Sequence, residues 1–454
     1  MKKRSHMRWL AVAAATAVVT VLAAGCSSGG SSSAGSAGSG NVTLHEWLWD
    51  PTQLSSYQAC ADAFHAKTGI TVDISQSGWS SYWSNLTTQL AAGQGPDIIT
   101  DHVGYYPQLV NAGQLVNLAP YFKQDGYNPA STGITTNGLW TKGNAIYGIS
   151  QDRDAVAVLY NTKDTTAASV TGLTWNPTNG GTFGALIKHL TVDKNGVRGD
   201  QPGFDKKAVK TYGFAMESGD GIAGQSSWAT FALDMGWYWT TPQAPFATTY
   251  NMGSPKLAQV FTWLQQMYND GYIAPEASAS SLGITPIMDQ NLAAMTFSGA
   301  WTISSYAPSA DKNQAYAWAQ LPTGPNGRSM TISNSLAQSV LSTSQHKAEA
   351  AKWVEFVGST ACQNLVAAKA VVFPSIPAEA AKVLAVDKAK GIDVSPFISE
   401  LDNASDLVSW PITDQGTQIN TLATTAIDDT LSRGQGNPSS VLTTLNSSIN
   451  ALLK

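Results

Sequence analysis

The hydrophobic positions after residue 41 follow two periods in turn. Short apolar runs predict β-strands at 42–49, 70–74, 97–100, 155–160 and 293–297. Apolar residues spaced three and four apart predict helices at 54–64, 82–90, 257–268 and 350–357. Glycine follows three of these segments, at Gly69, Gly93 and Gly271, as is common just past a helix end. This alternation predicts an α/β fold with mostly parallel sheets.

Length and composition limit the class of protein. The chain has 454 residues, enough for about two or three domains, and its 43% hydrophobic share excludes wholesale disorder. Only 13% of the residues are charged, against about 25% in an average globular protein, so the surface must be rich in uncharged polar residues. The formal net charge is -5, and no Lys/Arg cluster follows residue 8. A nucleic-acid-binding protein is excluded, because that class carries a basic patch.

The first 41 residues have the pattern of an export signal followed by a lipid anchor. Cationic residues up to Arg8 precede an apolar run at 9–24 that is too short and wrongly flanked for a spanning helix. Residues 22–26, LAAGC, resemble a bacterial lipobox, with Ala23 where Leu is commonest. We therefore expect a signal peptide at 1–25, diacylation of Cys26 and a flexible Ser/Gly tether over 26–41. The alternative is an ordinary secretory signal with an incidental cysteine.

Two further cysteines, Cys60 and Cys362, fall on apolar faces of predicted helices. An exported protein can form a disulfide, but the sequence does not show that these two residues meet. Their apolar surroundings slightly favour buried free thiols. The Cys and His spacing indicates no metal site, and no cofactor-binding motif or calcium loop is present, so we expect neither a metal nor a cofactor.

Several segments match the motifs of one family, in that family's order. They are 64–72 (FHAKTGITV), 90–99 (LAAGQGPDII), 112–118 (AGQLVNL), 146–149 (IYGI), 159–163 (LYNTK), 292–301 (LAAM followed by SGAW) and 347–356 (KAEAAKWVEF). With these motifs the chain resembles the extracellular solute-binding proteins of bacterial ABC sugar importers, the family that includes maltose-binding protein. The resemblance covers roughly residues 42–380, and the rest matches mainly in length and helical character.

The resemblance implies a two-lobed α/β fold of the periplasmic-binding-protein type, similar to type II, with the ligand in a cleft between the lobes. Each lobe would be discontinuous: 42–152 plus 330–374, and 153–329 plus 375–454. Closure about the crossing strands would hold the ligand and present a surface to a membrane permease. The protein would then be a monomeric, lipid-anchored receptor on the outer face of the bacterial cytoplasmic membrane, and not an enzyme.

Candidate contacts follow from the chemistry of sugars, whose C–H faces pack on aromatic rings while their hydroxyls bind polar side chains. Ligands of open α/β sheets lie beyond the carboxyl ends of the strands. Those positions hold Trp49, Asp50, Trp79, Tyr82, Asp101 and His102. We expect one of Trp79 and Tyr82 in the cleft and the other in the core or at the rim, and core packing is an equal alternative for Trp49 and Asp50. Asp101 replaces an aromatic of maltose-binding members, which predicts hydroxyl binding rather than a maltose contact; its alternative is a helix cap.

The resemblance adds candidates from the later part of the chain. They are Arg153, Asp154, Trp228, Trp301, Asn334 and Trp410. Asp154 aligns with a family carboxylate that binds sugar, and Arg153 would bind hydroxyls or form a hinge ion pair. Trp228 stands at the second lobe's aromatic position, and Trp301 follows a glycine turn where the family has a stacking ring.

The low content of basic residues disfavours a phosphorylated ligand, because Arg or Lys clusters usually hold phosphate. We therefore expect a neutral sugar or oligosaccharide, whose identity the sequence does not determine. Two other functions stay open. An exported glycoside hydrolase would need two carboxyls across the scissile bond, for which Asp101 and Asp154 are candidates. A cell-surface carbohydrate-binding module would bind sugar without hinge closure.

Overall fold

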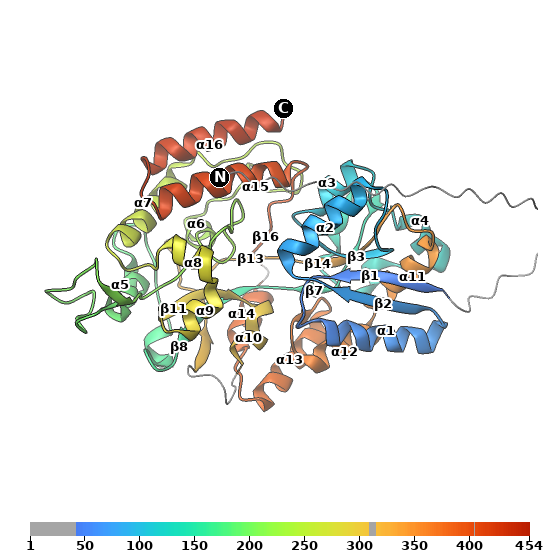
Figure 1. The fold of residues 1–454 in the computed structure, drawn as a ribbon, viewed down its shortest axis with the longest axis horizontal. Coiled ribbons are helices and arrows are strands. Elements are labelled where there is room, and N and C mark those ends of the chain that lie inside the picture. Colours follow the sequence, from blue (N-terminus) through green and yellow to red (C-terminus); the bar gives the residue numbers. More distant parts are fainter. Residues whose placement is uncertain (1–41, 308–314, 404) are drawn as a thin grey trace, which may run out of the picture. The chain divides into compact units, whose positions relative to one another are not determined.

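A computed structural model describes residues 42–307, 315–403 and 405–454 (Figure 1). The predicted signal peptide, lipidated Cys26 and tether lie outside these residues. Over the described ranges, no helix combines the length and the apolar character needed to cross a membrane.

The first lobe is built on a five-stranded sheet in the order β2-β1-β3-β14-β6. Its strands are β1 (Thr43–Leu48), β2 (Thr71–Gln76), β3 (Ile98–His102), β6 (Ile149–Ser150) and β14 (Leu336–Val340). Strand β1 pairs in parallel with β2 and β3, whereas β14 runs antiparallel to β3 and β6. The carboxyl ends of β1, β2 and β3 therefore meet at one edge, where the first lobe contributes its site residues.

Helices cover this sheet, and this lobe also contains two short 3₁₀ helices and two short strands. They are α1 (Leu54–Thr68), α2 (Trp79–Ala91), α3 (Tyr106–Asn111), α4 (Ala119–Asp125), α11 (Lys347–Val357) and α12 (Thr360–Lys369), with η1 (Pro129–Thr132), η2 (Asn137–Trp140), β4 (Thr141–Lys142) and β5 (Ala145–Ile146). Helix α1 buries Tyr57, Cys60 and Phe64 on one face, and Gly69 ends it with a left-handed φ of 76°. The predicted helix over 54–64 is confirmed, with four more residues at its end.

Cys60 and Cys362 form a disulfide with an S–S distance of 2.08 Å. The expectation of two free thiols is wrong. Helices α1 and α12 pack against each other with their apolar faces, and this brings the two Cα atoms to 5.1 Å. An apolar helix face indicates burial, but it does not identify the element that covers it.

The second lobe contains a three-stranded sheet in the order β11-β8-β12. Its strands are β8 (Val156–Asn161), β11 (Met295–Gly299) and β12 (Tyr316–Ala319), and a separate pair is formed by β9 (Val192–Asp193) and β10 (Val209–Thr211). Both β11 and β12 run antiparallel to β8, so the expectation of mostly parallel sheets is wrong here. A fully buried apolar run has the same pattern in either direction, which is why the sequence did not distinguish them.

The helices of this lobe enclose a core rich in aromatic rings. They are α5 (Gly181–Leu190), α6 (Ala229–Asp234), α7 (Pro255–Asn269), α8 (Glu276–Leu282), α9 (Ile284–Asp289), α10 (Ile303–Tyr306), α14 (Ser395–Asp402), α15 (Gly416–Leu431) and α16 (Pro438–Leu452), with η3 (Ala167–Val170) and η4 (Ala300–Thr302). Helix α13 (Pro377–Ala389) packs instead mainly against α12 of the first lobe. Trp228, Trp237 and Trp239 are fully buried together in this core.

Two short strand pairs connect the regions of the two sheets. Strand β7 (Asp152–Arg153), between β6 and β8 in the chain, pairs antiparallel with β15 (Phe373–Pro374). Strand β13 (Thr331–Ser333), just before β14, pairs in parallel with β16 (Leu407–Ser409). The chain thus passes from one lobe to the other beside both pairs, next to residues that line the cavity described below.

Candidate functional site

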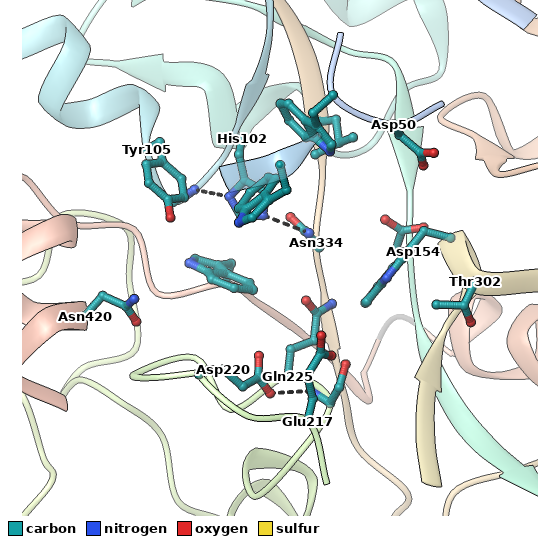
Figure 2. Close-up of a pocket in the computed structure, with 18 of the residues that line it drawn as sticks. Asp50, His102, Tyr105, Asp154, Glu217, Asp220, Gln225, Thr302, Asn334 and Asn420 are labelled. Carbon is teal, nitrogen blue, oxygen red and sulfur yellow. Dashed lines mark hydrogen bonds between the residues drawn. The ribbon is translucent and has the colours of Figure 1, made fainter. Parts of the chain in front are cut away.

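A cavity of about 890 Å³ is lined by residues of both lobes. This volume is in the range of small-molecule sites, roughly 300–1,000 Å³. Its aromatic lining consists of Trp49, Trp79, His102, Tyr105, Trp301 and Trp410. Figure 2 shows Tyr105 and Asn420 at one end of the cavity, and Asp50, Asp154 and Thr302 at the other.

An aromatic wall comes from the strand ends of the first lobe. Trp49 follows β1, and its ring meets that of Trp79 edge-on with centroids 5.0 Å apart. His102 ends β3, and its ring centroid lies 5.7 Å from those of both Trp79 and Tyr105. Such edge-on packing holds each ring in place while leaving faces free for a ligand.

His102 joins this wall to the strands between the lobes. Its Nε2 lies 3.0 Å from Nδ2 of Asn334, and its Nδ1 accepts a hydrogen bond of 3.0 Å from the backbone N–H of Gly104. Burial lowers the pKa of His102 to about 3. The imidazole is therefore uncharged at neutral pH and brings no positive charge to the cavity.

Carboxylates gather at the other end of the cavity. Asp50 accepts hydrogen bonds from Thr52 N–H at 2.8 Å and from Gln53 Nε2 at 3.1 Å, which fixes the turn after β1. Asp154 is only 2% exposed, yet its Oδ1 has no hydrogen-bond partner among the described residues. Burial, followed by the charges of Asp152 and Asp50, raises the pKa of Asp154 well above its usual range.

The second lobe adds polar groups from the segment 217–226. Asp220 accepts hydrogen bonds from Ser226 N–H at 2.6 Å and from Ser227 Oγ at 2.9 Å. Burial, followed by the charge of Glu217, raises the pKa of Asp220 to about 7. Figure 2 shows Glu217, Asp220 and Gln225 facing the cavity from this lobe. They supply acceptors and one amide for ligand hydroxyl or amino groups.

Trp301 supplies the second lobe's ring. It lies in η4 directly after β11, is half-buried and lines the cavity. Its ring packs against the backbone of Gly299, where a Cβ atom would come within 2.0 Å of the ring. The SGAW motif therefore needs glycine because of the close approach of the indole.

Comparisons with known proteins identify the family. The family model for bacterial extracellular solute-binding protein matches residues 49–364. The chain belongs to this family.

Solved structures with a similar fold match most of the length of this solute-binding protein. A substrate-binding protein from Listeria monocytogenes, in complex with cycloalternan, has a TM-score of 0.75 at 16% identity, covering 90% of this chain and 98% of that one. A solute-binding protein from Thermotoga lettingae bound with α-D-tagatose has a TM-score of 0.70 at 19% identity, covering 91% and 100%. UspC of M. tuberculosis has a TM-score of 0.68 at 20% identity, covering 90% and 100%. The fold is that of the two-lobed periplasmic binding proteins, as expected.

Eight of the sequence-predicted contacts line the cavity of this solute-binding protein. They are Trp49, Asp50, Trp79, His102, Asp154, Trp301, Asn334 and Trp410. Four others, Tyr82, Asp101, Arg153 and Trp228, are not among its lining residues. Trp79 and Tyr82 divide between cavity and core: Trp79 is 41% exposed, whereas Tyr82 is fully buried and donates from its hydroxyl to Thr100 O at 2.6 Å.

The other three lie elsewhere for separate reasons. Strand β3 continues through Asp101 and His102, so these neighbours point to opposite faces of the sheet, and Asp101 is buried while His102 lines the cavity. Arg153 pairs with Asp402 at 3.4 Å, the ion-pair alternative considered above. Trp228 donates from Nε1 to Gly221 O at 3.2 Å within the second-lobe core. We therefore do not propose these four as ligand contacts.

Sequence reasoning missed several lining residues. These are Tyr105, Glu217, Asp220, Gln225, Thr302 and Asn420, among others. Tyr105 was accessible to the same argument as His102, because it follows three residues later in the turn after β3. Glu217 and Asp220 lie in an irregular segment before Trp228, where no strand end marks them as site residues. Among the described His, Cys, Asp and Glu residues, no group of three is arranged to hold a metal ion.

Proposed function

We propose that the protein captures a sugar or short oligosaccharide without negative charge and delivers it to the permease of an ABC importer. The observation that carries this proposal is the combination of rings from both lobes, Trp49 and Trp301, with hydrogen-bonding groups in one cavity. Rings bind the C–H faces of a sugar, and the polar groups between them bind its edges. The bound sugars of two solved structures, cycloalternan and α-D-tagatose, support this ligand class.

Capture would proceed by closure of the lobes about the strands between them. Asn334 lies directly between β13 and β14 and touches His102, so a change at this connection reaches the aromatic wall. A ligand that contacts both walls favours the closed form by the difference in its affinity for the two forms. Specificity would come from buried polar groups that an incorrect epimer leaves unpaired.

We further propose the cellular setting expected from residues 1–41. Export would be followed by diacylation of Cys26, and the monomeric receptor would stay tethered to the outer face of the membrane. Tethering would raise its effective concentration near the permease. The lobe boundaries after residues 152, 329 and 374, with hinges beside β7 and β13, belong to this proposal.

The competing functions differ in what they require of the cavity. The hydrolase alternative relied on Asp101 and Asp154, but Asp101 does not line the cavity, so this pair is not available to a substrate. A carbohydrate-binding module would bind the same ligands without moving its lobes. Measurement of sugar consumption and of closure therefore separates the three functions.

The test is a thermal-shift and calorimetric screen of the purified protein against mono- and oligosaccharides. A ligand present at 100 times its dissociation constant stabilises the folded protein by about 2.7 kcal/mol. Trp301→Ala should raise Kd about 30-fold, or ~2 kcal/mol, whereas Trp301→Phe should retain most of the affinity. Small-angle X-ray scattering should show a more compact molecule with the ligand. Failure of every sugar to bind would refute the proposal, and sugar consumption would restore the hydrolase.

A further inference from the structure

Apart from the neutral His102, the ionisable side chains that line the cavity are all acids. Four carboxylates line it, Asp50, Asp154, Glu217 and Asp220, and the described lining residues include no Lys or Arg. Both lobes contribute, because Asp50 follows β1 while Glu217 and Asp220 belong to the second lobe. Closure brings carboxylates of both lobes around the ligand, and a negatively charged ligand would be repelled.

Nearby cations are held by partners outside the cavity. Arg153, next to Asp154 in the chain, pairs with Asp402 at 3.4 Å and is not a lining residue. Lys142 pairs with Asp414 at 2.6 Å, and its Nζ lies over the ring of Phe246. His102 is neutral for the reason given above. The side chains described around the cavity therefore do not compensate the carboxylates.

Asp154 indicates that a ligand supplies the missing partner. Its carboxyl group is buried and lines the cavity, and Oδ1 receives no hydrogen bond from the described residues. In Figure 2 it faces the same space as Asp50 and Thr302. A buried, unpaired carboxylate is costly, so native proteins pair such a group or keep it protonated. A hydrogen-bond donor with positive charge in this space would satisfy both Oδ1 and the surrounding charge.

We propose that the ligand of this cleft carries a positive charge, as in an amino sugar or an oligosaccharide with a free amine, and that its ammonium group donates to Asp154. This inference rests on the proposed capture of a sugar and makes its ligand class narrower. It differs from the neutral ligand expected from the sequence, because the sequence did not show that the lining carboxylates lack a counter-charge.

The pH dependence of binding distinguishes a cationic ligand from a neutral one. Asp154 is surrounded by Asp50, Asp152 and the phenol of Tyr57, and Asp220 by Glu217 and Asp428. Because burial and the charge of Glu217 raise the pKa of Asp220 to about 7, part of this set is protonated near neutral pH. Affinity for an ammonium group rises with pH as these carboxyls ionise, until the amine itself loses its proton. A neutral sugar gains no ion pair, and its affinity lacks this rise.

The experiment uses three β-1,4-linked disaccharides of one skeleton, with the corresponding monosaccharides as a second set. The glucosamine disaccharide carries free amines, its N,N′-diacetyl form is neutral, and cellobiose has hydroxyls at the same positions. Isothermal titration calorimetry from pH 5.5 to pH 8 measures Kd for the protein, for Asp154→Asn and for the control Asp62→Asn. Asp62 lies exposed on α1, so the control changes the net charge equally at a site outside the cavity.

We expect the amine to bind at least about tenfold more tightly than its neutral counterparts in one of the two sets. Asp154→Asn should remove most of that preference, and Asp62→Asn should retain it. Equal or tighter binding of the neutral sugars, with a ratio unchanged in Asp154→Asn, would overturn the charge inference and leave the sugar receptor intact. If neither amines nor neutral sugars bind, the proposed function fails, and the inference fails with it.

Discussion

The two walls of the cavity are held in different ways. Trp49 follows β1 and His102 ends the neighbouring strand β3, while Trp79 begins α2, directly after β2 on the other side of β1. On the opposite wall, Asp220 is held by hydrogen bonds to Ser226 and Ser227, a few residues further along the same loop. The first wall is thus fixed by long-range strand pairing, whereas Asp220 on the opposite wall is fixed by local contacts within its own loop.

This difference separates two tasks of a binding cleft. A wall fixed by the sheet presents aromatic surface that suits many sugars. A wall built from a loop can change its carboxylates without changing the sheet, because loops tolerate substitution better than the elements they connect. The choice among ligands should therefore depend more on residues 217–226 and on Asp154 than on the aromatic wall.

The largest expected effect concerns the disulfide, which joins α1 to α12 in the first lobe. Replacing both Cys60 and Cys362 with Ala should lower the free energy of unfolding by about 2–5 kcal/mol, because the unfolded chain loses a cross-link. Urea denaturation measures the loss. Hydrogen exchange should show the loss of protection in α1 and α12. Helix α7 lies in the second lobe and is the internal control. An equal loss of protection in α7 would show that the lobes do not differ in this way.

A second effect comes from Glu46, fully buried in β1 beneath the first wall. Its Oε2 accepts a hydrogen bond of 2.8 Å from Trp353 Nε1, and burial raises its pKa from 4.5 to about 8. Because the pKa is higher in the folded protein than in the unfolded chain, the stability linked to the protonated carboxyl is fully present at a pH below 4.5. That stability is lost as the pH rises through about 8. Glu46→Gln should therefore recover on the order of a few kcal/mol at pH 9 relative to pH 5.

Denaturation of both proteins at five pH values measures this difference. Burial also raises the pKa of Asp101 and of Asp152 to about 7, so the variant retains part of the pH dependence. The informative quantity is the difference between the two curves. Parallel curves would mean that Glu46 does not ionise in the folded protein over this range.

The elements that form the first wall could be predicted because strand ends have a local signal. The apolar runs at 42–49 and 97–100 predicted two central strands, and the end of the first run predicted Trp49 and Asp50 as site residues. The error at Asp101 arose from a strand that continues two residues further than predicted. Since side chains alternate along a strand, this extension placed Asp101 in the core and His102 in the cavity.

The second lobe behind the opposite wall was harder to predict, because its strand direction and its aromatic packing depend on contacts distant in the sequence. The antiparallel direction of β11 and the burial of Trp228 among Trp237 and Trp239 follow from packing that no local pattern specifies. Trp301 is the exception. It was predicted because the family resemblance places a stacking ring at the SGAW motif, which also combines a strand end, a glycine and an aromatic ring.

That motif gives the smallest effect and the sharpest test of how the second wall is built. Gly299 has an ordinary φ of -80°, so any residue fits its backbone conformation, but a Cβ there would lie 2.0 Å from the Trp301 ring. Gly299→Ala must therefore move the indole, and it should raise Kd about five- to tenfold, roughly 1 kcal/mol. Calorimetry with a ligand identified by the proposed sugar screen measures the change in Kd. Gly138→Ala is the control, because a Cβ at Gly138 meets no atom within 4 Å. If Gly299→Ala binds as tightly as the natural protein, the position of the indole does not determine affinity, and the second wall acts mainly through its carboxylates.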